Sequence, residues 1–273
     1  MTAIAAETLP PPHLHTRRWS ATGVALLGLW ALITVLMVWA LAHSLTGDRF
    51  ATYGWRFFAG FWTTIRLVFF SVLIGAIISV PVAAGRLSKN RVINTLAYCY
   101  SYFFRGTPLI AQLFLIYYGA GEFVGPLKAV GLWWFFRDAF NCAVLSFAMN
   151  TAAYQSEILA GSIRNIPYGQ REAGAALGLH WFVILRKIVL PQALIVALRP
   201  YGNEVVLMIK ASAVAAIVTV LDLMGQTRFI FSKTYDLSFY LWAAVFYLVL
   251  VEVLGRVVNL IERRITRHVM ARR

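Results

Sequence analysis

The chain alternates long apolar stretches with shorter polar ones. A hydrocarbon core about 30 Å thick is crossed by roughly 20 residues of helix, and six stretches are long and apolar enough for that. They cover approximately residues 22–43, 60–84, 93–118, 132–160, 193–221 and 237–259. We therefore predict an all-α polytopic membrane protein with six transmembrane helices.

The overall composition supports a membrane protein rather than a soluble one. Hydrophobic residues make up 60% of the chain and charged residues 13%, and the mean hydropathy is +0.70. The first stretch is longer than the apolar part of a secretory signal and lacks a small-residue cleavage site, so we predict an uncleaved helix. The two cysteines, Cys99 and Cys142, lie inside apolar stretches without metal-ligand spacing, which indicates neither a disulfide nor a metal site.

The basic residues predict the orientation of the chain. The formal net charge is +14, but the cations do not form one patch interleaved with aromatic residues, which argues against nucleic-acid binding. One set of alternate loops holds fourteen Lys and Arg residues and the opposite set holds five. The positive-inside rule therefore places both termini in the cytoplasm. The fourteen are Arg17, Arg18, Arg86, Lys89, Arg91, Arg164, Arg171, Arg186, Lys187, Arg263, Arg264, Arg267, Arg272 and Arg273.

Two apolar stretches contain helix-weakening residues beside a charge. Arg105-Gly106-Thr107-Pro108 lies in the third stretch, and Pro200-Tyr201-Gly202-Asn203-Glu204 lies in the fifth. Broken helices at membrane depth are tolerated only where they are buried in protein or line a water-filled cavity. We expect a break at both places, facing the interior of the protein.

A polar segment, residues 161–191, separates the fourth stretch from the fifth. It predicts a first short helix with small side chains that ends at Gly178, a second amphipathic helix over 180–189, and a sharp return to the membrane at Pro191. The chain has no GxxxxGK[ST] phosphate loop and no HExxH or GxSxG signature, so we expect no catalytic residue and no resident cofactor.

This polar segment resembles the EAA loop, the ATPase-docking segment of permease subunits of ATP-binding-cassette (ABC) importers. The matching positions are Glu172, Ala173, Gly174, Gly178, Ile188, Leu190 and Pro191. The segments FFRGTPLIAQLFLIYYG (103–119), LSFAMNTAAYQSEILAGSIRNIPYGQREA (145–173) and the GNE of 202–204 are similar to one branch of that family, the polar amino-acid permeases of the histidine, arginine, lysine and opine type.

The resemblance covers residues 58–265 and implies a domain organisation. Residues 58–265 would form the five-helix importer core, with its coupling loop at 161–191. A cytoplasmic arm (1–21) and an extra helix with an outer loop (22–57) would precede it, and a basic cytoplasmic tail (266–273) would follow. The resemblance places the chain in a bacterial inner membrane.

The resemblance also implies partners. ATP and Mg would be bound by a separate ABC ATPase docked on the EAA loop. A soluble extracytoplasmic binding protein would deliver substrate to the outer loops at 44–59, 119–131 and 222–236. A second permease subunit would complete the pathway for polar amino acids of the basic class, or for opines. Among its partners we count membrane lipids and no nucleic acid.

Intramembrane polar and ionisable residues are costly to keep and are candidates for the substrate pathway. The resemblance implies that Glu204 lies near a bound amino acid, and Asn150, Tyr154 and Glu157 share one helical face. Two alternatives remain: Arg105 and Glu157 could form a structural pair, and Lys210 could neutralise Glu204. The candidate residues are Arg105, Thr107, Asn150, Glu157, Asn203, Glu204, Lys210 and Ser212.

One departure from the family pattern concerns the partner subunit. Many members carry an acidic residue directly after the lysine of the fifth stretch, where this chain has Ala211. We therefore expect a heterodimer in which a different permease supplies the missing acid. The alternative function is an ion-coupled secondary amino-acid transporter with an ion relay through its buried charges, although we find no inverted repeat.

Overall fold

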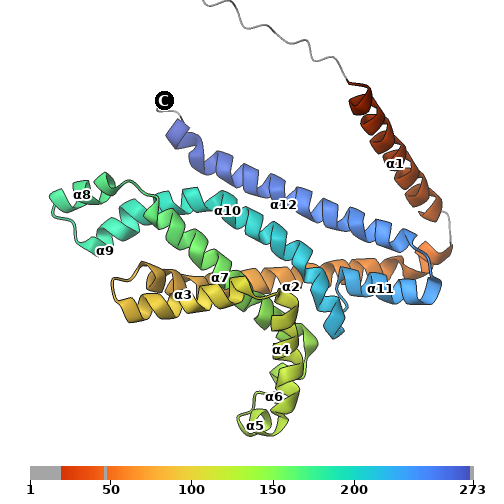
Figure 1. Cartoon of the computed structure of the whole chain (residues 1–273), viewed down its shortest axis with the longest axis horizontal. Coiled ribbons are helices and arrows are strands. Elements are labelled where there is room, and N and C mark those ends of the chain that lie inside the picture. Colours follow the sequence, from red (N-terminus) through yellow and green to blue (C-terminus); the bar gives the residue numbers. More distant parts are fainter. Residues whose placement is uncertain (1–19, 46–47, 271–273) are drawn as a thin grey trace, which may run out of the picture. The chain divides into compact units, whose positions relative to one another are not determined.

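The computed structural model describes residues 20–45 and 48–270, with the side chains of 48, 50 and 266–270 left aside (Figure 1). Within these ranges every regular element is a helix, which confirms the all-α fold. Residues 1–19 of the predicted arm and 271–273 of the basic tail lie outside the described residues. The chain divides into two units, residues 1–46 and 47–273.

The first unit contains one described helix, α1 (Ala21–Leu45), which confirms the helix expected at 22–43. It is apolar on all sides, and none of its residues is buried. A helix that is hydrophobic all round is typical of a span surrounded by lipid or by another protein. By length and composition α1 is able to cross a membrane.

The second unit begins with α2 (Asp48–Leu87), a helix of 40 residues. At 1.5 Å per residue it is about 60 Å long, roughly twice the thickness of the hydrocarbon core. The expected outer loop at 44–59 is therefore wrong for most of its length, because helix replaces it from Asp48 onward. This first part of α2 is held by packing: the ring of Phe57 stacks on Phe239 with 5.7 Å between centroids.

The break expected in the third stretch is confirmed. Helix α3 (Arg91–Gly106) ends before Thr107, which is extended (φ −106°, ψ 146°), and α4 (Leu109–Glu122) starts after Pro108. The proline ring disfavours helical backbone at the preceding residue. The side chain of Gln112 donates to the carbonyls of Phe104 and Thr107 at 2.9 and 3.2 Å, so the break leaves these groups hydrogen-bonded.

The fourth stretch forms α7 (Ala139–Arg164), preceded by the short helices α5 (Val124–Ala129) and α6 (Trp133–Phe136). Asp138 caps α7 by accepting from the backbone N–H of Asn141 at 3.0 Å. Sixteen residues of α7 are buried, and it packs against α2, α3, α4 and α10. Helix α7 is thus the centre of the unit.

The break expected at Pro200–Glu204 is wrong. Helix α10 (Leu190–Ala211) continues through Pro200 and Gly202. Gly202 serves packing: a Cβ there would lie 2.8 Å from the side chain of Val258 on α12 (Ser238–Met270), so glycine lets the two helices approach closely. The irregularity comes later, where the 3-10 helix η2 (Ser212–Val218) ends at Thr219 with a φ of +66° and α11 (Leu223–Thr234) follows.

Four described helical segments are long and apolar enough to cross a membrane: Ala21–Leu45, Ala51–Leu87, Trp181–Val218 and Ser238–Ile265. The other two expected spans correspond to the divided α3–α4 pair and to α7, whose buried faces carry many polar residues. A helix surrounded by protein does not need the composition of one facing lipid. The count of six spans therefore stays a prediction.

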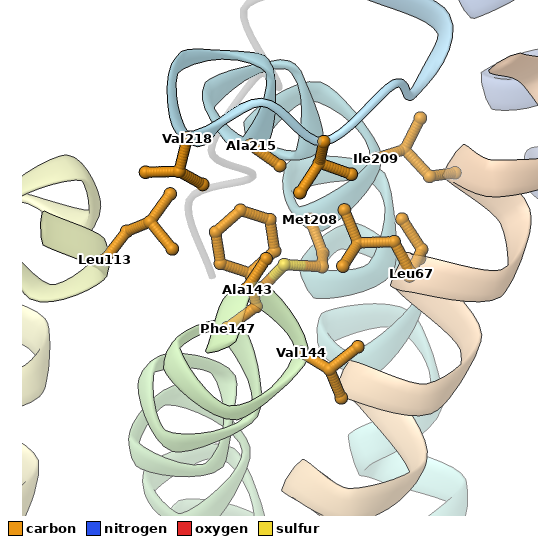
Figure 2. Close-up of a cluster of buried hydrophobic side chains, with 11 residues drawn as sticks. Leu67, Leu113, Ala143, Val144, Phe147, Met208, Ile209, Ala215 and Val218 are labelled. Carbon is orange, nitrogen blue, oxygen red and sulfur yellow. The ribbon is translucent and has the colours of Figure 1, made fainter. Parts of the chain in front are cut away.

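A hydrophobic cluster joins the central helices (Figure 2). Phe147 of α7 is fully buried and lies among side chains of neighbouring elements, including Leu113 of α4, Met208 of α10 and Val218 of η2. Leu67 of α2 completes it on another side. This cluster fixes the position of the α3–α4 break relative to α7 and α10.

The close approach of α2 and α7 depends on Gly75, where a Cβ would lie 2.5 Å from Cγ2 of Thr151. We predict that Gly75→Val destabilises the protein by about 1–3 kcal/mol because an over-packed interface must separate. Thermal unfolding of the purified protein in detergent measures this. The matched variant Gly161→Val, at a glycine with open space around it, is expected to change the midpoint little; equal losses would refute the packing argument.

Candidate functional site

The polar segment between α7 and α10 folds as two short helices. Helix α8 (Tyr168–Ala176) ends as expected just before Gly178, which has a φ of +72°. The N–H of Gly178 donates to the carbonyl of Ala175 at 2.9 Å, and that of Leu179 to the carbonyl of Gly174 at 3.2 Å. These bonds close the carboxyl end of α8 in the way that a left-handed glycine allows. Helix α9 (Trp181–Ile184) follows.

The EAA-like positions divide between surface and interior. Glu172 and Ala173 are exposed, whereas Gly174 is buried. A Cβ on Gly174 would lie 3.0 Å from Ile184 and 3.2 Å from Ile188. The absence of a side chain at Gly174 therefore lets α8 pack on the next helix. The exposed small-residue surface of α8 is formed by Ala173, Ala175 and Ala176.

The sharp return at Pro191 is wrong, because the helix continues through this residue. Helix α9 runs into a π-helical turn, η1 (Leu185–Val189), and then into α10. Proline has no N–H to donate to the carbonyl four residues earlier, and its ring crowds that carbonyl. The wider turn directly before Pro191 relieves this conflict, and Gln192 donates from its side chain to the carbonyl of Ile188 at 2.9 Å.

The break between α3 and α4 opens onto a cavity of about 380 Å³, here called the Glu204 cavity. It lies between this break, α7 and α10. The lining residues are Thr107, Pro108, Leu109, Asn150, Tyr154, Glu204, Leu207, Met208 and Ala211. Three predicted pathway residues, Thr107, Asn150 and Glu204, thus meet in one place although they come from three different segments of the chain.

Glu204 is 5% exposed as a residue, and its carboxylate accepts a hydrogen bond from the hydroxyl of Thr151 at 2.8 Å. Thr151 in turn accepts from the side chain of Gln155 at 3.2 Å. No ion pair joins Glu204 to Lys210 in the part of the chain that the structure describes. Arg105 attracts this carboxylate electrostatically but forms no ion pair with it among the described residues, so the buried acid is suited to bind a further cation.

Asn150 is positioned by the irregular backbone opposite it. Its side-chain amide donates to the carbonyl of Phe104 at 2.7 Å and to the side chain of Gln112 at 3.0 Å. Gln112 also donates to the hydroxyl of Thr107 at 2.7 Å. Asn150 therefore fastens the α3–α4 break to α7, and Gln112, which the sequence reasoning missed, is the centre of this network.

A second cavity of about 350 Å³, the Glu157 cavity, lies between α2, α3 and α7. Its lining residues are Arg86, Tyr98, Ser101, Tyr102, Arg105, Gly106 and Glu157. The pair considered between Arg105 and Glu157 is wrong: Glu157 binds Arg86, with 2.6 Å between Oε1 and Nε. The guanidinium of Arg105 instead lies over the ring of Tyr154, 5.3 Å from its centroid.

Three other predicted pathway residues line neither cavity. Asn203 and Lys210 are exposed on α10. Ser212 is fully buried, and its hydroxyl donates to the carbonyl of Ile209 at 2.8 Å, which is a structural role. Among the described residues, no group of His, Cys, Asp and Glu could hold a metal ion.

Comparison with known proteins agrees with this architecture. Residues 71–267 match the family described as binding-protein-dependent transport system inner membrane component. The chain is 46% identical to the nopaline transport system permease protein NocM of Agrobacterium fabrum, over 77% of this chain and 88% of the relative. It is 41% identical to the histidine/lysine/arginine/ornithine transport system permease protein HisM of Salmonella typhimurium, over 81% and 94%.

Solved structures have the same fold. The crystal structure of an amino acid ABC transporter with histidines superposes with a TM-score of 0.68 at 32% identity, covering 78% of this chain and 96% of the other. The MetNI methionine ABC transporter in an inward-facing conformation superposes with a TM-score of 0.65 at 23% identity, covering 78% and 97%, and supports the fold alone. The chain therefore belongs to the family of inner membrane components of binding-protein-dependent transport systems.

Proposed function

We propose that this chain is the permease subunit of an ABC importer that takes up polar amino acids of the basic class, or opines. The observation that carries the proposal is the Glu204 cavity, in which a nearly buried carboxylate, an amide and a backbone break face the same space. The names of two relatives, which transport nopaline and histidine, lysine, arginine or ornithine, support this substrate class.

In this proposal the cavity binds the cationic part of the substrate. Glu204 provides the negative charge, and Thr107, Asn150 and Tyr154 provide hydrogen-bonding groups around it. Opposite charges attract strongly where water is excluded. Because the buried carboxylate has already lost its hydration, a cationic ligand offsets more of that free-energy cost than a neutral one does. A neutral side chain gives no such compensation.

The EAA-like segment would receive the ATPase. Its exposed face, with Glu172 and Ala173, is free to contact another protein, and its buried face connects to the membrane helices through a cluster with Ile163, Ile184 and Val189. Hydrolysis of ATP with Mg on a separate ATPase subunit would move α8 and α9, and this motion would pass directly into α10, which carries Glu204.

The remaining partners follow from the same scheme. An extracytoplasmic binding protein would deliver substrate, and a second homologous permease would complete the pathway in a bacterial inner membrane. The excess of basic residues on one set of loops supports cytoplasmic termini. We set aside the ion-coupled secondary transporter because the relatives are ABC transport proteins and no observation favours an ion relay.

Removing the charge at the cavity tests the substrate class. We predict that Glu204→Gln lowers the uptake of arginine, lysine or nopaline by about tenfold or more, since a charged hydrogen-bonding partner contributes about 1.5–3 kcal/mol. ATP-driven uptake into vesicles that contain the whole transporter measures this. Glu252→Gln, at an exposed position of α12, is the control; a wild-type rate in Glu204→Gln would contradict the proposed site.

Coupling is tested at the turn after α8. A side chain at Gly178, where φ is +72°, costs about 1 kcal/mol or more in backbone strain. We predict that Gly178→Val and Glu172→Lys each reduce uptake at least about fivefold, as a loss of about 1 kcal/mol in coupling free energy would. The amount of permease in the membrane is expected to stay unchanged. Gly169→Val and Gln170→Lys, at exposed positions of α8, are the matched controls. Uptake that survives equally in all four variants would remove α8 from the coupling path.

The expected heterodimer is tested by leaving out the second permease. Because this chain has Ala211 where an acid is expected, we predict that it does not support substrate-stimulated ATP hydrolysis with only the ATPase and the binding protein. Reconstitution in vesicles with and without a second, different permease subunit measures this. Full stimulation by this chain alone would show that it functions as a homodimer.

A further inference from the structure

The ion pair of the Glu157 cavity is built as an exchangeable contact. Arg86 at the end of α2 binds Glu157 of α7, and the two side chains are only 15% and 22% exposed. Arg86 has further partners: the ring of Tyr98 with its centroid 5.1 Å away, and Oδ1 of Asn94 at 3.2 Å. If another cation took its place at Glu157, Arg86 would remain stabilised by these two groups.

Arg105 is the second cation of the cavity. None of the ion pairs found between the described side chains includes it. Its guanidinium stacks on Tyr154, and the hydroxyl of Tyr154 donates to the Arg105 carbonyl at 3.5 Å. Because Tyr154 lines the Glu204 cavity and Arg105 lines the Glu157 cavity, this stacked pair forms the partition between the two.

The charges of the Glu157 cavity match one class of ligand. With two guanidinium groups and one carboxylate, the cavity has an excess positive charge that favours a ligand carboxylate. Arg105 forms no ion pair with the carboxylate of this cavity, and its charge is attracted to Glu204 of the neighbouring one. Glu157 at the other side favours a cation. Tyr98 and Tyr102 add aromatic faces, on which guanidinium and ammonium groups bind favourably. The volume of about 350 Å³ lies within the range of small-molecule sites.

We propose that the Glu157 cavity is a second subsite for amino acids with a cationic side chain, on the coupling-loop side of the Glu204 cavity. This proposal rests on the proposed function. The α-carboxylate binds Arg105, and the side-chain cation displaces Arg86 from Glu157. Arg86 then keeps its contacts with Tyr98 and Asn94.

The location suits a step late in import. Glu157 follows Asn150 by seven residues on α7, about 10 Å nearer to the end that leads into α8. Displacing Arg86 breaks the ion pair between α2 and α7 beside this end. A substrate with a neutral side chain cannot replace Arg86, so the subsite adds selectivity after the Glu204 cavity. The Arg86–Glu157 ion pair would therefore hold α2 and α7 together until a cationic substrate displaces Arg86.

Substituting the two residues of the ion pair is expected to change the affinity for L-arginine in opposite directions. Glu157→Gln removes the cation's partner and lowers the affinity for L-arginine about tenfold or more. Arg86→Gln removes the competitor and raises this affinity. The measurement is calorimetric titration of the nucleotide-free complex of permeases and ATPase in lipid nanodiscs without binding protein. It is repeated in the Glu204→Gln background so that the two cavities are distinguished.

L-citrulline, which carries a neutral urea group in place of the guanidinium, is the second probe, and its binding is expected to respond to neither variant. The control variants are Arg199→Gln and Glu262→Gln, which remove a similar ion pair of 2.8 Å between α10 and α12. Their affinity for arginine is expected to stay within about twofold of wild type, a smaller change than the loss of one charged hydrogen bond would cause. Two results would overturn the subsite and indicate a merely structural pair. One is that Glu157→Gln and Arg86→Gln change the affinity for arginine in the same direction, and the other is that the affinity for citrulline changes as much as that for arginine.

Uptake by the wild-type transporter separates this inference from the function on which it rests. If vesicles with the complete transporter and its binding protein accumulate no amino acid or opine, the proposed function fails. Two other results leave the permease function standing and show that the second subsite is wrong. In one, the vesicles accumulate only neutral amino acids. In the other, arginine is taken up but Glu157→Gln and Arg86→Gln change its affinity in the same direction.

Discussion

The structure depends on a polar helix that must be kept away from lipid. Helix α7 carries Asn, Thr, Gln, Ser and Glu side chains in the buried centre of the unit, where an unsatisfied polar group costs several kcal/mol. The surrounding helices supply the partners: the carbonyl of Phe104 for Asn150, Glu204 for Thr151, the carbonyl of Val72 for Gln155 and Arg86 for Glu157. These bonds join α7 to three helices, α2, α3 and α10, so the need to satisfy this helix holds the centre of the unit together.

The same requirement explains the small residues. Gly75 and Ala148 allow α2 to lie close against α7, and Gly202 does the same for α10 and α12. In a membrane, packing and hydrogen bonds between helices replace much of the hydrophobic driving force, and both need short distances between backbones. Hydrogen bonding of buried polar groups and close glycine contacts are thus two parts of one solution, and the Glu204 and Glu157 cavities lie beside the α3–α4 break, where the helix is interrupted.

Local chemistry was readable from the sequence, and pairing over long distances was not. The break at Thr107-Pro108 and the end of α8 at Gly178 follow from backbone preferences of the residues themselves. Pro200 and Pro191 failed as breaks because tertiary packing and a π turn keep the helix continuous. The partner of Glu157 lies 71 residues away on another helix, and no spacing rule selects Arg86 over Arg105. The cavities themselves required the three-dimensional arrangement.

Under the proposed function, the ATPase and the substrate would need no long transmission path. Helix α10 begins at the π turn beside the coupling segment and carries Glu204 fourteen residues later, about 20 Å along one rigid element. Helix α7 connects the same segment to Asn150 and Glu157. A displacement of α8 and α9 therefore acts on both walls of the Glu204 cavity at once. In this proposal the π turn (Leu185–Val189), an irregularity of a kind frequent at functional sites, is the point at which α10 would change direction relative to α7.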